Sequence, residues 1–432
     1  MLIESGCLLN LSKKTRIYFN LSIVLFLLGF IFFNYYNEIN NQYINSIEVT
    51  ILLILFFNVG IKRNFDQSSL LLLITIFQII AIVLVNLNNV VDTPIDSTFY
   101  RFNGLYYTIQ DWGDLSKLID VADWGYVTFV GFFYELFGSQ TGEIIIIGVK
   151  ILLHVWTCKF IFLIVADLFN VKNARIVTLL WGLNLGATYW ITSFLKENLF
   201  CFVVTCAVFC LYKYQRVSWK DNKLVYLILF FFSLLCTALF REIFPLFFIM
   251  TFMSFTLIPK IVNKYFGLIC IFAVLASYFA TDFIVYFVPN AAGGFIQREE
   301  FYGNSMMMAV LNVINPLISP YPALNINTNQ IANIQISAFA SYNIVFAYFI
   351  IMGAYYVIKN KLNKMYPLIM VLLLNSVMLI SYGFSMNFRY IYITTPIAYI
   401  LIPYGLHNYC KLKLLVPYVF FVISLTLLYN VR

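Results

Sequence analysis

Cationic residues recur where apolar segments of this sequence begin or end and in the two long polar segments between them. They are Lys196, Arg241 and Arg389 at the segment ends, and Arg101 and Arg298 in the long polar segments. A guanidinium group matches phosphate oxygens with two parallel hydrogen bonds, so cations that converge on one face suit a phosphate or pyrophosphate. We predict that these five residues bind pyrophosphate. The alternative is that each pairs with a neighbouring glutamate or anchors a helix at the lipid headgroups.

Carboxylates near these cations are candidates for acid–base chemistry. A carboxylate at the end of an apolar segment can take the proton from an attacking sugar hydroxyl as a general base. The residues predicted to be catalytic are Asp92, Asp96, Glu197 and Glu242. Tyr302 and Tyr390 suit hydrogen bonding and ring stacking on a sugar, and we predict that they bind substrate. The competing interpretation is that these side chains are ordinary solvated loop residues.

No motif for a cofactor accompanies these residues. The sequence has no His-Glu-x-x-His, no Gly-x-Ser-x-Gly and no phosphate-binding glycine loop. Their absence from the sequence argues against the common zinc proteases, serine hydrolases and ATP-driven pumps. We therefore predict no cofactor for the leading function given below.

The elements that must position these residues are membrane helices. Of the 432 residues, 62% are hydrophobic and 11% are charged, whereas soluble domains carry about 25% charged residues. The formal net charge of +8 does not indicate nucleic-acid binding, because the basic residues lie in short clusters between apolar segments. Residues 1–432 are predicted to form one all-α integral membrane domain.

Apolar segments of about 20 residues, the length that crosses a bilayer, occur about thirteen times. Their approximate positions are 18–36, 44–61, 68–87, 143–166, 175–193, 198–213, 223–240, 243–258, 265–288, 338–358, 365–384, 390–406 and 413–430. With the amino terminus in the cytoplasm, 18 Lys and Arg residues fall inside and seven fall outside, while Lys150 and Lys159 lie within a helix. Such a bias sets the orientation of membrane proteins.

One apolar segment, 125–138 (GYVTFVGFFYELFG), is too short to span a bilayer. Counting it as a crossing would place Lys172 and Arg175 outside, so we predict a helix in the outer interface or a re-entrant helix. Two long external loops are predicted at about 88–142 and 289–337.

The order of several motifs resembles the GT-C class of membrane glycosyltransferases. The motifs lie within residues 88–215 and 385–406, and they are Asp92-Thr-Pro-Ile-Asp96, Gly125-Tyr126, Tyr134-Glu135-Leu136-Phe137-Gly138, Ser193-Phe-Leu-Lys196-Glu197 and Phe388-Arg389-Tyr390 with Pro396. That class uses polyprenyl-phosphate-linked sugars on the non-cytoplasmic face. The resemblance therefore implies a GT-C-like fold, with Asp92 or Asp96 as the catalytic aspartate. The chain departs from the class where Trp124-Gly125-Tyr126 replaces the usual Pro-Pro.

The chain as a whole also resembles the O-antigen polymerases of the Wzy type. Those proteins have many membrane helices rich in Phe, Ile, Tyr and Asn, and functional arginines in two external loops. The resemblance places such arginines at Arg101 and Arg298, with Arg241 and Arg389 nearby. The related ligases use an external histidine, and the segments predicted to lie outside contain none.

We therefore expect a polymerase of undecaprenyl-pyrophosphate-linked oligosaccharide repeat units, which builds O-antigen or capsule at the periplasmic face of a bacterial inner membrane. Its expected partners are the polyprenyl-linked oligosaccharide, membrane lipid and a chain-length regulator, without nucleic acid. The first alternative is a GT-C transferase that adds one sugar from a polyprenyl-phosphate donor, with a divalent metal at external carboxylates. The second is a lipid-linked oligosaccharide flippase or other transporter, although transporters usually show two related halves.

Overall fold

The computed structural model describes residues 55–59, 65–87, 95–106, 123–217, 222–241, 243–279, 332–382, 388–409 and 412–431. Every regular element within these ranges is a helix, which confirms the predicted all-α class. The helices are α3 (Gln67–Leu87), α4 (Ile95–Tyr106), α6 (Trp124–Phe137), α7 (Ser139–Leu168), α8 (Val171–Gly182), α9 (Leu185–Thr192), α10 (Glu197–Arg216), α11 (Lys223–Ala238), α12 (Ile243–Leu257), α13 (Pro259–Phe279), α17 (Ala332–Lys359), η3 (Asn363–Met365), α18 (Tyr366–Tyr382), α19 (Phe388–Tyr399), α20 (Ile402–Tyr409) and α21 (Leu412–Val431).

Four helical stretches within the described ranges are long and apolar enough to cross a bilayer. They are Ser139–Leu168, Glu197–Arg216, Pro259–Ala276 and Asn363–Ile380. Large apolar side chains also lie exposed on the outer helices, for example Leu152 at 57%, Leu235 at 69% and Phe272 at 66%. Exposed apolar surface of this kind is compatible with a surrounding lipid phase. The total of thirteen crossings stays a prediction.

The single helix predicted for residues 175–193 is wrong, because the structure breaks it into α8 and α9. Asn184 ends the first half and caps the second, since its side chain accepts a hydrogen bond from the Gly186 amide at 2.8 Å. The Gly182 carbonyl that the break releases accepts a hydrogen bond from Gln78 Nε2 of α3 at 2.9 Å. His154 Nε2 of α7 also lies 3.3 Å from this oxygen, so polar side chains from two neighbouring helices satisfy the backbone that the break releases.

The helix predicted for residues 390–406 is also divided, into α19 and α20. Pro403 lies in the first turn of α20, and its ring has no N–H to donate to the carbonyl four residues before it. The amides of Ile400 and Leu401 instead bond three residues back, at 3.2 and 3.0 Å. Proline at a helix start is favourable, so this break follows from local sequence.

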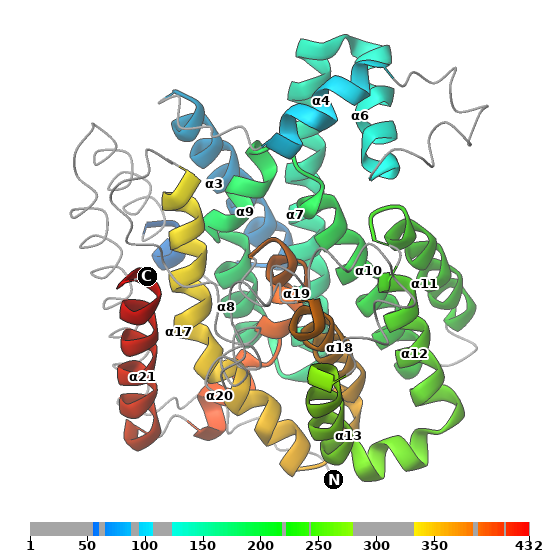
Figure 1. Ribbon diagram of the computed structural model, residues 1–432, viewed down its shortest axis with the longest axis vertical. Coiled ribbons are helices and arrows are strands. Elements are labelled where there is room, and N and C mark those ends of the chain that lie inside the picture. The colour runs from blue at the N-terminus through cyan, green and yellow to red at the C-terminus, as the bar shows by residue number, and fades with distance from the viewer. Residues whose placement is uncertain are drawn as a thin grey trace.

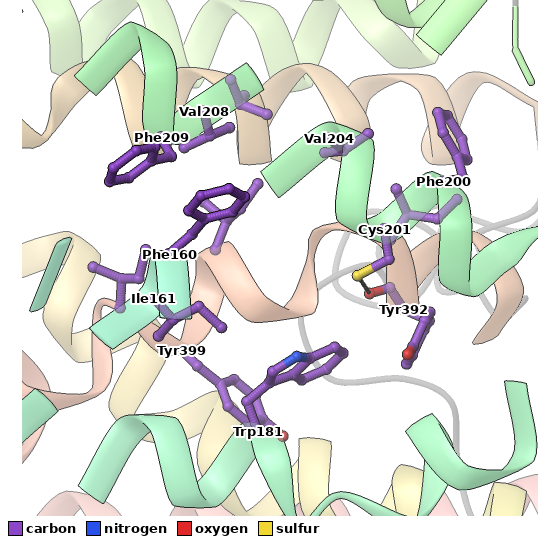
Figure 2. Close-up of a cluster of buried hydrophobic side chains, with 14 of the residues drawn as sticks. Phe160, Ile161, Trp181, Phe200, Cys201, Val204, Val208, Phe209, Tyr392 and Tyr399 are labelled. Atoms are coloured by element: carbon purple, nitrogen blue, oxygen red, sulfur yellow. Dashed lines mark hydrogen bonds between the residues drawn. The ribbon is translucent and has the colours of Figure 1, made fainter. Parts of the chain in front are cut away.

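Helix α10 runs through the middle of the bundle, and α7, α11 and α19 pack against it (Figure 1). Figure 2 shows part of the core on this helix, where Phe209 stacks on Phe160 of α7 with ring centroids 4.7 Å apart. Cys201 lies 3.8 Å from the Tyr392 carbonyl of α19. Trp181 of α8 packs on the Tyr392 ring at 5.1 Å. This packing fixes the start of α10, which carries two of the candidate site residues.

Two helices, α4 and α6, lie within the described part of the first predicted external loop. The sequence reasoning did not predict α4, whereas α6 covers the short apolar segment and is 14 residues long. Both lie at one end of the bundle, next to the start of α7 (Figure 1). Gly138 joins α6 to α7 with φ of 76°, a conformation that suits glycine. The placement of α6 in the outer membrane interface stays a prediction.

The predicted orientation can be tested at two positions whose side chains are exposed. Ser139, at the start of α7, and Asn360, after α17, are predicted to lie outside and inside respectively. In a variant without native cysteines, Ser139→Cys should react with an impermeant maleimide in intact spheroplasts. Asn360→Cys should react only after the membrane is permeabilised. The opposite labelling pattern would reverse the predicted topology.

Candidate functional site

Charged side chains from five separate parts of the chain meet at one end of the bundle. They come from the start of α4, the residue before α6, the start of α10, the connection between α11 and α12, and the start of α19. We call them the ionic cluster, which consists of Asp96, Asp123, Lys196, Glu197, Arg241 and Arg389. Three carboxylates and three cations balance one another there. Asp92, Glu242, Arg298 and Tyr302 lie outside the described residues.

Arg389 links two of the predicted catalytic acids. Its Nη1 donates to Asp96 Oδ2, while Nε and Nη2 donate to Glu197 Oε1 at 2.9 and 2.8 Å. The two acids differ sharply in exposure, because the Asp96 side chain is 46% exposed and the Glu197 side chain is 2% exposed. Asp96 is therefore accessible to a substrate hydroxyl, whereas Glu197 is placed to orient the guanidinium.

Lys196 is buried and pairs with Asp123, which also accepts a hydrogen bond from the Tyr100 hydroxyl at 2.6 Å. Burial, and next the Arg241 guanidinium, lower the pKa of Lys196 to about 8 although Asp123 and Glu197 oppose the shift. Burial alone would raise the pKa of Asp123, but Lys196 and the two hydrogen bonds outweigh it and leave that pKa lowered. Burial, and next the charge of Asp123, raise the pKa of Tyr100. Asp123 is thus a weak base and an effective counter-ion.

Arg241 has a different environment from the other cations of the cluster. Its Nη2 donates to the Tyr390 hydroxyl at 3.0 Å, and its guanidinium lies 4.7 Å from the centre of the Tyr390 ring. Among the described residues it has no carboxylate hydrogen-bond partner, and its buried Nε has no hydrogen-bond partner. Because Lys196 and Arg241 repel each other, an anion between them would be stabilised.

Arg101, the remaining predicted phosphate ligand in the described ranges, pairs with a carboxylate outside the ionic cluster. Its Nε donates to Glu143 Oε1 at 2.9 Å, and its Nη1 donates to Ser97 Oγ at 3.1 Å. Tyr134 also donates to the same Glu143 oxygen, at 2.9 Å. The Arg101 guanidinium lies 4.8 Å from the centre of the Phe194 ring. Its observed contacts are therefore those of a neutralised structural ion pair.

Asp123 and Tyr100 were missed as site residues by the sequence reasoning. Asp123 precedes α6 with φ of 60°, and its side chain makes no capping hydrogen bond to that helix. Aspartate tolerates this left-handed conformation better than most residues do. The available sequence signal was an aspartate directly before the apolar segment 125–138, but its partner Lys196 lies 73 residues further along the chain.

The arrangement can bind an anion beside an accessible carboxylate. Lys196 and Arg241 supply adjacent positive charge, Tyr390 supplies a ring and a hydroxyl, and Asp96 supplies a base. In the ranges that the structure describes, no group of three or more His, Cys, Asp or Glu side chains is placed to hold a metal ion. The chemistry that these groups can perform is proton removal from a hydroxyl and stabilisation of a leaving phosphate.

No protein-family model, curated protein or solved structure matches this chain. Any functional assignment therefore depends on the residues and contacts of the ionic cluster. The helices around the cluster and the exposed apolar surface are compatible with a membrane protein.

Proposed function

We propose that this protein is a membrane glycosyltransferase that uses a polyprenyl-phosphate-linked sugar donor. One observation carries the proposal. Three residues from motifs that are far apart in the sequence meet at the end of an apolar helical bundle, where Arg389 contacts both Asp96 and Glu197. These three belong to the motifs on which the resemblance to the GT-C class depends. A GT-C-like architecture, with the cluster on the periplasmic face of the inner membrane, is part of the proposal.

The reaction would follow from the positions of the charges. Asp96 takes the proton from the acceptor hydroxyl, whose oxygen forms a bond to the anomeric carbon of the donor sugar. The bond between that carbon and the phosphate oxygen breaks, and its electron pair leaves with the polyprenyl phosphate. Lys196 and Arg241 stabilise the charge that develops on the phosphate. Arg389 orients Asp96 by donating a hydrogen bond to it.

Two reactions fit this chemistry, and the transfer of a single sugar is supported better. Asp96, Glu197 and Arg389, which come from three of its motifs, are brought together. Arg298, on which the polymerase interpretation also depends, lies outside the described residues. The polymerisation of pyrophosphate-linked repeat units is the second candidate. The adjacent cations Lys196 and Arg241 favour it, because two phosphate groups carry more charge to neutralise.

A transporter is supported less well, even though broken helices are common at transporter sites. The break between α8 and α9 is satisfied from within the protein. Gln78 donates to the freed Gly182 carbonyl, Thr188 donates to Gln78 Oε1 at 2.9 Å, and the Asn184 side chain caps α9. The charged groups of the ionic cluster lie instead at the ends of helices.

The proposal can be tested with the purified full-length chain in lipid nanodiscs. A radiolabelled sugar on polyprenyl phosphate and the same sugar on polyprenyl pyrophosphate should be offered with a glycan acceptor. We expect transfer of label to the acceptor and release of polyprenyl phosphate. Turnover of the pyrophosphate donor alone, with products of increasing length, would favour the polymerase. Flipping of either lipid without transfer would contradict both enzymes.

The lowered pKa of Lys196 predicts the pH dependence of this reaction. If the ammonium binds the donor phosphate, kcat/KM should fall as the pH rises through about 8, well below the 10.5 of an ordinary lysine. The Lys196→Arg variant should lose that alkaline limb, because arginine stays charged. Initial rates at low donor concentration across neutral and alkaline pH measure the effect. An unchanged limb in Lys196→Arg would assign the titration to another group.

A further inference from the structure

Lys150 is a fully buried cation in the middle of α7 that the proposed reaction does not use. Its Nζ donates to the Leu195 carbonyl at 2.8 Å and lies 3.4 Å from the Trp190 carbonyl. It is also 5.5 Å from the ring centres of Tyr126 and Phe194. A buried ammonium is costly unless it is paired, so these carbonyl contacts compensate part of the burial.

The Trp190 carbonyl belongs to the last turn of α9, and the Leu195 carbonyl belongs to the connection between α9 and α10, which contains a strained residue. Phe194 has φ of 55°, in the left-handed region that a bulky side chain rarely adopts. Its ring is fully buried, and Arg101 and Lys150 both lie within cation–π distance of it. Lys196 and Glu197 follow within three residues. Their positions in the ionic cluster thus depend on a backbone turn that needs support from outside.

We infer that Lys150 is a positioning residue, which holds the Trp190–Leu195 turn by its carbonyls and so places Lys196 and Glu197 for substrate binding. It acts from α7, whose own first turns pack against α6, and it touches none of the proposed reacting atoms. A methionine side chain could fill about the same volume, but it has no donor for either carbonyl. The expected effect of Lys150 on substrate binding rests on the proposed function, whereas its expected effect on the stability of the turn does not.

Lys159 offers a matched control on the same helix. Its ammonium lies 4.2 Å from the centre of the Trp156 ring, and Trp156 belongs to α7 as well. Lys150→Met and Lys159→Met should be compared with the native chain in nanodiscs by hydrogen exchange and thermal unfolding. Binding of undecaprenyl phosphate incorporated in the same nanodiscs should be measured alongside. Arg101→Gln, at a partly exposed site, serves as a second variant if Lys150→Met does not fold.

Lys150→Met should accelerate amide exchange in residues 193–199 by about tenfold or more, with α8 and the rest of α7 unchanged. It should weaken undecaprenyl phosphate binding by about tenfold, and Lys159→Met should do neither. Arg101→Gln should accelerate exchange at the same residues to a smaller degree. Two outcomes would overturn the inference. One is amide exchange that rises evenly along α7 and α8, and the other is unchanged exchange in residues 193–199 of both Lys150→Met and Arg101→Gln. If the native chain itself binds no undecaprenyl phosphate, the proposed function fails while the exchange result still decides the role of Lys150.

Discussion

Replacing Arg389 by alanine should cause a large loss of both activity and stability in this protein. Arg389 donates to Asp96 and twice to Glu197, whose side chain is only 2% exposed. Removing one partner of a buried pair leaves an uncompensated charge, which typically costs about 3–5 kcal/mol. The same change frees Asp96 from its orienting contact, so transfer should fall by about a hundredfold or more. Thermal unfolding and initial rates in nanodiscs measure the two effects.

A more exposed arginine pair provides the control for this prediction. Arg216 donates to Asp167 at 2.7 Å, and the Asp167 side chain is 40% exposed. Exposed pairs contribute about 0–1 kcal/mol, so Arg216→Ala should change stability little. Adding Glu197→Gln to Arg389→Ala should restore part of the lost stability, because the buried charge is then absent. Equal stability losses in Arg389→Ala and Arg216→Ala, without rescue by Glu197→Gln, would contradict a buried ionic role.

The sequence allowed the helical class and much of the cluster to be predicted. Apolar runs of bilayer length correspond to α3, α7 and α10 within a few residues, because hydrophobic length and flanking charges report directly on membrane helices. The predicted alternation of inside and outside loops placed the starts of α10 and α19 on the same side of the membrane. In the structure these two helix starts meet, because Arg389 contacts Glu197. The prediction succeeded where a property of consecutive residues decides the structure.

The sequence reasoning failed where a distant partner decides the structure. The break at Asn184 is stabilised by Gln78, which lies on another helix, so a hydrophobicity pattern over residues 175–193 gave one continuous helix. Asp123 became part of the site through Lys196, and no local motif marks that pair. The role of Arg101 as a pyrophosphate ligand stays a prediction, but no local motif marks its pairing with Glu143, which lies 42 residues further along the chain. Pairing between side chains requires the packing of helices, which composition does not specify.

The contrast between Arg241 and Asp96 should separate the two enzyme reactions. For single-sugar transfer, Asp96→Asn removes the proposed base but leaves an oxygen for Arg389, so kcat should fall by about 10²–10⁴-fold with little change in KM. Arg241→Ala should mainly raise KM for the donor, by about tenfold, as a charged hydrogen bond to phosphate is lost. Arg241→Lys should recover little, because a point charge does not reproduce the two-pronged contact.

In the polymerase, by contrast, Arg241 binds a pyrophosphate leaving group, which carries more charge than a monophosphate. The transfer reaction then depends less on any one base. Arg241→Ala should then abolish long polysaccharide chains in cells, while a single completed repeat unit still reaches the surface lipid. Asp96→Asn should leave chain length nearly unchanged. Gel profiles of surface glycan from cells that carry each variant distinguish the outcomes, with Arg216→Ala as the control. Two results together would exclude the polymerase: full-length chains in Arg241→Ala and a glycan that lacks one sugar in Asp96→Asn. Repeat units that are joined normally but lack one sugar indicate a transferase that acts before the repeat units are joined.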